Sequence, residues 1–187
     1  MTRILGISGS LRRDSHNTNL LRAAAEAAGP DVELVLYAGL KDIPPYDEDD
    51  DVHPRPESVA RLNAAIADAD AVLFSTPEYN SSIPGQLKNA LDWVSRPVAT
   101  NVLRNKPVAV VGASTGGFGA VWAQAELRKV LSALGARVLD IEVPVPHAHT
   151  RFGEEGLTDD EIRASLAETV EALADEARER ERVREPA

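Results

Sequence analysis

Hydroxyl, amide and guanidinium side chains are concentrated between residues 8 and 18, in the run Ser-Gly-Ser-Leu-Arg-Arg-Asp-Ser-His-Asn-Thr. The side chains of Ser10, Ser15, Asn17 and Thr18 can donate hydrogen bonds, and Arg12 can add a charge-assisted contact to a phosphate. The run contains neither the Gly-x-Gly-x-x-Gly fingerprint of dinucleotide sites nor the Gly-Lys-Ser/Thr of a P-loop. It predicts a site for one terminal phosphate, such as that of a mononucleotide. The alternative is a plain turn with serine and asparagine caps.

A second polar segment, residues 76–85, contains two prolines and a glycine that stiffen its backbone. A rigid loop of this kind can present backbone N–H groups to the edge of a flat heteroaromatic ligand. Tyr79 offers a packing face, and Asn80 offers both donors and acceptors. The alternative is a long turn that leads into a helix, with Ser82 near the cap.

A third loop, residues 112–120, has three glycines within four positions, Gly116, Gly117 and Gly119. Glycines allow a backbone to approach a ligand closely. The alternative is a flexible loop without a ligand.

Residues 112–116 also match G-x-S-x-G, the turn that carries the nucleophile of α/β-hydrolases. Ser114 would be the nucleophile, and Asp140 and then His147 or His149 follow it in the expected chain order. A serine hydrolase is therefore a rival interpretation. It leaves the two other polar loops without a role.

Short β-branched runs alternate with amphipathic stretches along the chain, which predicts βαβ units around a parallel sheet. We expect strands at residues 3–7, 32–37, 71–75, 107–111 and 137–143. The third of these begins with four consecutive apolar residues, which is typical of a central strand covered on both faces.

The intervening segments predict helices with one apolar face each. One helix should span residues 18–28, and four others should bury the sets Val59, Leu62, Ile66 and Ala69; Leu87, Ala90, Leu91 and Val94, with Pro84 in the first turn; Leu127, Val130, Leu131 and Leu134; and Ile162, Leu166, Val170 and Leu173. A capping box at residues 158–161 should open the last helix, whose charged end is expected to fray from about residue 178.

Five strands with helices between them predict one α/β domain over residues 1–187, a doubly wound three-layer sandwich with strand order 2-1-3-4-5. Ligands of such sheets bind beyond the carboxyl ends of the strands, where the strand order switches. The three polar loops follow the first, third and fourth strands, so we expect them to meet there.

Composition excludes several classes of function. The chain has 30 acidic and 20 basic residues and a net charge of -10, which argues against a nucleic-acid binder and against docking on an anionic membrane. The chain contains no cysteine, which excludes thiolate catalysis and thiolate metal sites, so redox chemistry would need a cofactor. We find neither a signal peptide nor an apolar run of membrane-spanning length, and a cytoplasmic location is expected.

No metal site is expected. His147 and His149 are two residues apart, but no third ligand is evident. The acidic run at residues 47–51 lacks the glycine-centred loop of an EF-hand and is interpreted as a solvated loop.

Taken together, the motifs resemble the NADPH-dependent FMN reductase family. They are, in chain order, Gly9-Ser10-Leu11-Arg12 with Ser15 and Asn17, then Pro77-Glu78-Tyr79-Asn80, then Ser82-Ile83-Pro84-Gly85 followed by Leu87 to Trp93. The resemblance runs from about residue 3 to residue 143. It implies a flavodoxin-like fold, noncovalently bound FMN, NADPH or NADH as reductant, and a homodimer or homotetramer. Its members reduce free flavin, quinones, azo dyes or chromate, so the partner would be a small-molecule electron acceptor.

The same resemblance assigns roles to individual residues. Ser10, Arg12, Ser15, Asn17 and Thr18 would hold the FMN phosphate; Pro77, Glu78, Tyr79 and Asn80 would line the isoalloxazine ring; and Ser114, Gly116, Gly117 and Gly119 would complete the pocket. No side chain is expected to be catalytic, because FMN carries the hydride transfer. Position 81 is often glycine in the family and is Ser81 here. An electron-carrying flavodoxin without a nicotinamide site is a second alternative, although the arginine-bearing loop fits the reductase pattern better.

Overall fold

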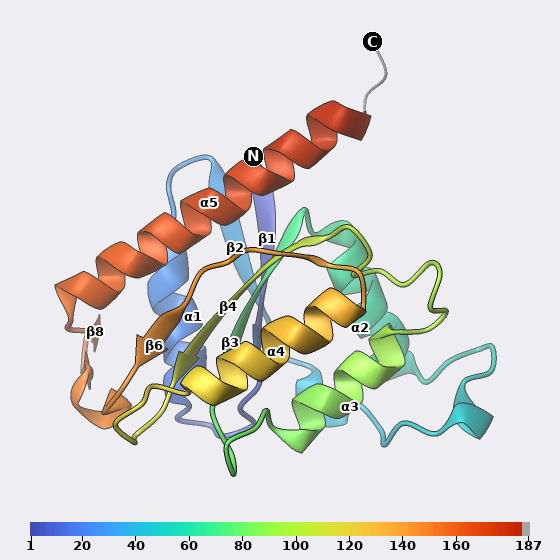
Figure 1. The fold of residues 1–187 in the computed structure, drawn as a ribbon, viewed down its shortest axis with the longest axis horizontal. Coiled ribbons are helices and arrows are strands. Elements are labelled where there is room, and N and C mark those ends of the chain that lie inside the picture. Colours follow the sequence, from blue (N-terminus) through green and yellow to red (C-terminus); the bar gives the residue numbers. More distant parts are fainter. Residues whose placement is uncertain (185–187) are drawn as a thin grey trace.

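A parallel sheet forms the centre of the molecule. The computed structural model describes residues 1–184. Its sheet has the order β2-β1-β3-β4-β5, with β6 also paired to β4, which confirms the predicted α/β fold and strand order (Figure 1). The strands are β1 (Thr2–Ser8), β2 (Val32–Tyr37), β3 (Ala71–Thr76), β4 (Pro107–Ala113), β5 (Arg137–Val138) and β6 (Val143–Val145).

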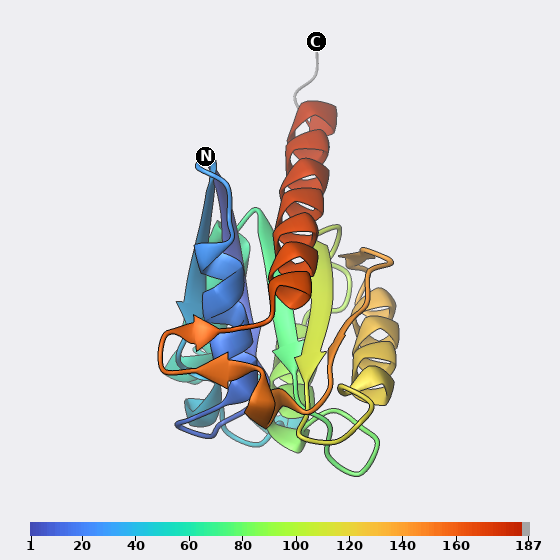
Figure 2. The ribbon, with the colours of Figure 1, turned by 90° about the vertical axis from the view of Figure 1, so that its left-hand side faces the viewer.

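Five α-helices cover the two faces of this sheet. They are α1 (His16–Glu26), α2 (Glu57–Asp68), α3 (Gly85–Val94), α4 (Val121–Ala133) and α5 (Asp160–Arg184). Apolar residues of α2, α3 and α4 form one core on one face, and those of α1 and α5 form a second core on the other (Figures 1 and 2). Every residue of β3 and β4 is buried, because helices cover both faces of these strands.

The remaining elements are short and were not predicted. They are the 3₁₀ turns η1 (Leu40–Asp42), η2 (Glu48–Asp50) and η3 (Ala148–Thr150), and the antiparallel pair β7 (Phe152–Gly153) and β8 (Gly156–Leu157). The strands of the main sheet run in the same direction, so the loops that follow β1, β3 and β4 emerge together at the lower edge in Figures 1 and 2.

The last predicted strand, residues 137–143, is interrupted. Val138 pairs with Val108 and Val143 pairs with Val111, so the edge of the sheet contains two more residues than β4 over this stretch. The extra residues cannot join the ladder, and the strand divides into β5 and β6. Pro144, which has no N–H, lies in β6, where an edge strand tolerates it.

Three helix starts differ from the sequence predictions. Helix α1 begins at His16 rather than at residue 18, because the hydroxyl of Ser15 caps it. Pro84 is the N-cap of α3 and lies before its first turn. At the start of α5 the side chain of Asp159, not that of Thr158, accepts hydrogen bonds from the N–H groups of two following residues, both at 3.1 Å.

Helix α5 continues to Arg184. The final part of the expected frayed end, residues 185–187, lies outside the described residues, and the fraying itself stays a prediction. Among residues 1–184, no helix has the length and hydrophobicity that crossing a bilayer requires.

Candidate functional site

The three polar loops meet in one narrow pocket at the carboxyl edge of the sheet. Its volume is about 100 Å³, and its lining comprises Ser10, Arg12, Ser15, His16, Asn17, Pro77, Glu78, Tyr79, Ala113, Ser114 and Thr115. Each of the three loops therefore contributes predicted residues to the same cavity. Thr18, Asn80, Gly116, Gly117 and Gly119 were also expected there and do not line it.

The start of α1 forms one end of this pocket. Ser15 is buried and its Oγ accepts a hydrogen bond from the backbone N–H of Thr18 at 3.2 Å. The backbone N–H groups of His16 and Asn17 donate to no other described residue, so they remain available at the positive end of the helix dipole. Arg12 is exposed at the rim, and within residues 1–184 its guanidinium donates only to the carbonyl of Asp14, at 3.3 Å. These donors fit a phosphate monoester.

Asn17 has a structural role that the sequence did not reveal. Its Oδ1 accepts from Ser75 Oγ at 2.9 Å and from the N–H of Ala113 at 3.0 Å. Its Nδ2 donates to the carbonyl of Ala113 at 2.9 Å. The buried amide therefore connects the start of α1 to the ends of β3 and β4, and its oxygen is already satisfied within the protein.

Thr18 lies on the other side of the β1–α1 loop. Its Oγ1 donates to Ser8 Oγ at 3.1 Å, and both side chains line a neighbouring cleft rather than the narrow pocket.

His16 lines the pocket and was missed by the sequence reasoning. Its ring stacks on Phe152, with centroids 5.7 Å apart, and its Nδ1 is buried without a partner among the described residues. Burial lowers the pKa of His16 below its usual value, and the nearby charges of Arg12 and His149 lower it further. The sequence did contain a signal that His16 lines the pocket, because it lies between two predicted site residues, Ser15 and Asn17.

The loop after β3 forms a tight turn. The N–H of Tyr79 donates to the carbonyl of Ser82 at 3.0 Å, and the reciprocal bond is 3.1 Å. Asn80 and Ser81 complete the turn with φ values of 53° and 61°, in the left-handed region. The N–H of Tyr79 is therefore already used, whereas the residue as a whole is 47% exposed beside the pocket.

Glu78 contributes to the pocket lining, but its carboxylate is directed elsewhere. The Oε2 atom accepts from the backbone N–H groups of Trp122 and Ala123, both at 3.1 Å. Glu78 thus caps α4 and holds the β3–α3 loop against the loop after β4. A carboxylate is also favourable at a helix N-terminus because of the helix dipole.

The glycines after β4 differ in environment. Gly116 and Gly117 are exposed beyond the pocket. Gly119 is buried with φ +60°, and a Cβ there would lie 2.6 Å from the backbone nitrogen of Val145. Gly119 is required for close packing of this loop against β6.

Ser114 lines the pocket without the surroundings of a hydrolase nucleophile. Its Oγ accepts from the N–H of Gly116 at 3.2 Å, and no histidine among the described residues donates to it or accepts from it. Ser114 does not have the positive φ found in a strained elbow, and α4 starts only at Val121. The geometry contradicts the serine hydrolase interpretation.

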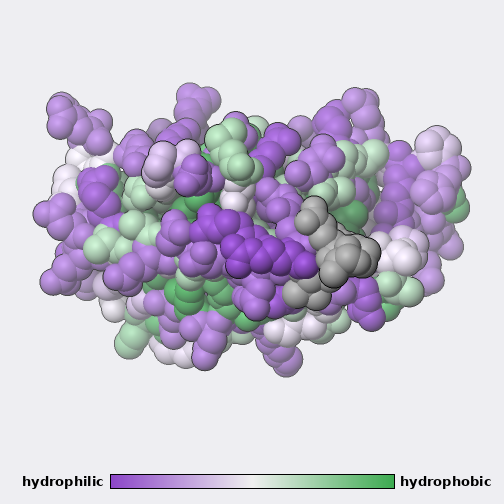
Figure 3. All heavy atoms as spheres, turned by 90° about the horizontal axis from the view of Figure 1, so that it is seen from above, coloured by the Kyte–Doolittle hydropathy of each residue, from purple (hydrophilic) through white to green (hydrophobic). Residues whose placement is uncertain are grey.

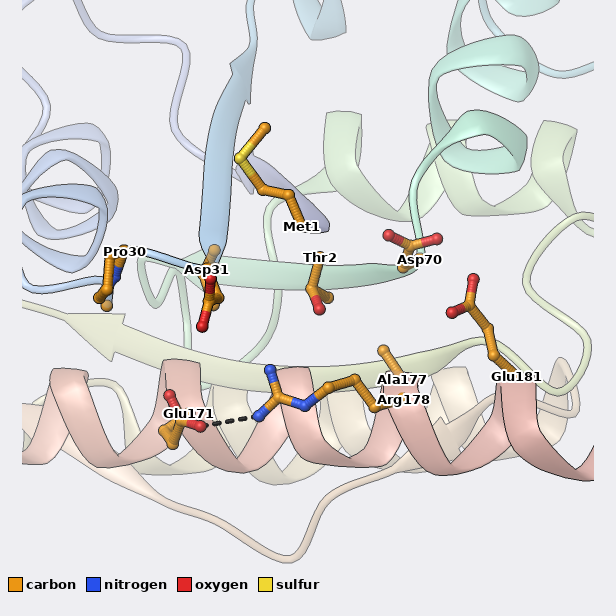
Figure 4. A pocket seen from close by; sticks show the side chains of 11 residues that line it. Met1, Thr2, Pro30, Asp31, Asp70, Glu171, Ala177, Arg178 and Glu181 are labelled. Atoms are coloured by element: carbon orange, nitrogen blue, oxygen red, sulfur yellow. Dashed lines mark hydrogen bonds and ion pairs between the residues drawn. The ribbon is translucent and has the colours of Figure 1, made fainter.

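Another cavity lies at the opposite end of the sheet, between α5 and the amino ends of the strands. Its volume is about 490 Å³ (Figure 4). Asp31, Asp70, Glu171 and Glu181 line it, and Arg178 donates to Glu171 at 2.7 Å. The face seen from this end is largely hydrophilic (Figure 3). None of the predicted site residues lies in this cavity, and no group of three potential metal ligands occurs among residues 1–184.

Comparison with known proteins agrees with the loop motifs. The model of the NADPH-dependent FMN reductase family matches residues 2–150. An NAD(P)H-dependent FMN reductase of Pseudomonas aeruginosa is 42% identical over 91% of this chain and 92% of that protein. A quinone reductase of Pseudomonas putida is 37% identical over 90% of both chains.

The fold comparison gives the same result. A solved flavoenzyme NAD(P)H:acceptor oxidoreductase from Paracoccus denitrificans, FerB, superposes with a TM-score of 0.86 at 35% identity, covering 96% of this chain and 98% of that one. The sequence and fold comparisons agree with each other. The chain therefore belongs to the NADPH-dependent FMN reductase family.

Proposed function

We propose that the protein is an FMN-dependent NAD(P)H oxidoreductase that passes electrons to a small organic acceptor of the quinone or flavin class. The observation that carries this proposal is the narrow pocket in which the free N–H groups of α1, Ser10 and Arg12 converge. The names of the enzyme relatives support the reaction class. Azo dyes and metal oxyanions remain candidate acceptors by family resemblance.

The chain's own residues would bind and orient the cofactor. The start of α1 and Arg12 would hold the phosphate, because N–H donors, a helix dipole and a guanidinium act together on one dianion. The backbone of residues 77–80 and the loop at Ser114–Gly117 would lie along the ring. The chemistry that FMN would supply when these residues hold it is hydride transfer between the nicotinamide and the acceptor.

We assign no catalytic acid–base pair, because the polar side chains at the pocket are engaged in contacts within the protein. Glu78 caps α4, and Asn17 is held between β3 and β4. The N–H groups of Glu78 and Asn80 form no hydrogen bond with another described residue, so they could stabilise negative charge on the ring. The N–H of Tyr79, which closes the turn, could not.

We also propose that the enzyme is a homodimer or homotetramer. Phe118 and Trp122 are 65% and 47% exposed next to the site, with ring centroids 4.9 Å apart. Exposed aromatic pairs of this kind are enriched at protein interfaces. A second copy seated on this pair would shield the open side of the pocket. The proposed location is the cytoplasm, where NAD(P)H is available as reductant.

The direct test is the visible spectrum of the purified full chain. We expect a yellow protein, or a protein that binds added FMN, whose flavin absorbance bleaches when NADPH is added without air and returns when a quinone follows. A chain that stays colourless with excess FMN would overturn the cofactor assignment. A chain that binds FMN but is not reduced by either nicotinamide would instead be an electron carrier.

A further inference from the structure

A second cleft lies on the α1 side of the sheet, across the β1–α1 loop from the narrow pocket. Its volume is about 310 Å³. Gly6, Leu21 and Leu36 form its apolar base, since the side chains of β1 and β2 on this face are small or aliphatic. Gly6 helps to open it, because a Cβ there would lie 3.1 Å from Leu34 and would fill space between β1 and α1.

The rim of this cleft is basic. Arg12, Arg22 and Lys41 line it, all three are exposed, and none of the lining residues is acidic. None of the three forms an ion pair with a carboxylate among the described residues; Arg22 donates instead to Asn19 Oδ1 at 2.7 Å. Arg12 is already assigned to the FMN phosphate, so Arg22 and Lys41 are the cations left for a second anion. In a chain of net charge -10, an acid-free cleft with these two cations favours an anionic ligand.

The cleft adjoins the narrow pocket, because two residues belong to the lining of both. Ser10 and Arg12 line both the narrow pocket and this cleft. Two hydroxyl side chains also line the cleft, Ser8 and Thr18, and Thr18 Oγ1 donates to Ser8 Oγ. A ligand seated over the proposed flavin and extending across the β1–α1 loop would reach an apolar surface first and cations at its edge.

We infer that this cleft binds the adenosine 2′-phosphate end of NADPH, an inference that rests on the proposed reductase function. The apolar base suits a purine ring, and the cations suit a phosphate dianion. The volume lies at the lower end of the range for ligand pockets, about 300–1,000 Å³, so it accommodates part of a dinucleotide. NADH lacks this phosphate, so the cleft would select NADPH.

The first test measures binding alone. Calorimetry on the FMN-loaded full chain should detect adenosine 2′-phosphate, with weaker binding of adenosine and of inorganic phosphate. The double variant Arg22→Ala/Lys41→Ala should lower the affinity for adenosine 2′-phosphate about tenfold, since each exposed cation contributes modestly. Lys129→Ala, an exposed lysine on α4, is the matched control and should change nothing.

The second test measures selectivity. The double variant should raise the KM for NADPH about tenfold and leave the KM for NADH within about twofold. Unchanged affinity for adenosine 2′-phosphate in the double variant, in a protein that still binds FMN and oxidises NADPH, would overturn the inference. Equal binding of inorganic phosphate would also overturn it, because the purine would then have no role. If the proposed function itself were wrong, the wild-type chain would not bind FMN, or its bound FMN would not be reduced by a nicotinamide.

Discussion

Arg12 connects three hollows at the carboxyl edge of the sheet. It lines the narrow pocket, the basic cleft beside α1, and a more open cleft of about 370 Å³ that also contacts Tyr79. In the described part of the chain its guanidinium has one hydrogen-bond partner, the carbonyl of Asp14. A side chain in this position is free to turn toward a ligand phosphate.

Replacing Arg12 with alanine should therefore weaken FMN binding. We expect the dissociation constant to rise about 10- to 100-fold, the range for a hydrogen bond to a charged group. Arg13→Ala removes an equally exposed arginine that lines none of these hollows and is the matched control. Fluorescence titration of FMN measures both, and equal affinities in the two variants would contradict the phosphate assignment.

His16 should make stability depend on pH. Its folded-state pKa is lowered, first by burial and then by Arg12 and His149, so the unfolded chain binds the proton more readily. The free energy of unfolding should therefore fall as the pH drops below about 6.5. His16→Gln removes this titration, and the difference between wild type and variant should change between pH 8 and pH 5. A difference that stays constant over this range would contradict the assignment.

Residue types near the pocket could be predicted from the sequence, but their partners could not. Ser10, Arg12 and Ser15 belong to one short loop, and local spacing was enough to place them. Asn17 bonds to Ala113, 96 residues away, and Glu78 bonds to Trp122, 44 residues away. Such pairings depend on how the sheet brings distant loops together, which composition and periodicity do not encode.

The turn from Tyr79 to Ser82, between β3 and α3, contains two left-handed residues. Two consecutive left-handed residues match the turn type that closes a two-residue hairpin, which favours asparagine and glycine. Asn80 suits the first position, whereas Ser81 has a Cβ that crowds the backbone at φ 61°. The turn is held in place by its two backbone hydrogen bonds and by the neighbouring Glu78, whose carboxylate accepts from the first turn of α4.

Ser81→Gly should accordingly stabilise the protein by about 1 kcal/mol, because glycine adopts a positive φ without steric cost. Ser82→Gly is the matched control, since Ser82 is not among the residues with positive φ and should lose stability or stay unchanged. Thermal unfolding of both variants measures the effect. A lower melting temperature for Ser81→Gly would show that the serine is not strained.

The existence of the main strands and helices followed from apolar periodicity, and their ends depended on contacts. Residues 71–75 could be recognised as a central strand because the first four positions are all apolar. The division between β5 and β6 could not, because it results from the register against β4. The start of α5 depended on whether Thr158 or Asp159 faced the free N–H groups, and both residues are good caps.

Across the whole molecule, the two ends of the sheet differ in chemistry. Loops with hydroxyls, glycines and arginines gather at the carboxyl ends, whereas acidic residues surround the cavity at the amino ends (Figure 4). Phe118 and Trp122 lie on the loop and helix start beside the carboxyl edge. Any partner that covers them would also lie beside the pocket.

Trp122 lies at the proposed interface between subunits, so a charge at this position should weaken assembly. Trp122→Glu should shift the protein toward the monomer in light-scattering chromatography and lower reductase activity, because a buried charge opposes association. Lys129→Glu places the same charge farther along α4 and should keep the wild-type assembly. A Trp122→Glu protein that keeps the wild-type mass would exclude this aromatic pair from the interface.

The buried amide of Asn17 has a consequence for how the cofactor is taken up. Because it anchors α1 to the ends of both central strands, the walls of the pocket are held in register before any ligand arrives. Flavin uptake should then be a single kinetic phase whose rate rises linearly with flavin concentration, without a slower isomerisation step. An apoenzyme built this way can lose and regain its flavin repeatedly without rearranging.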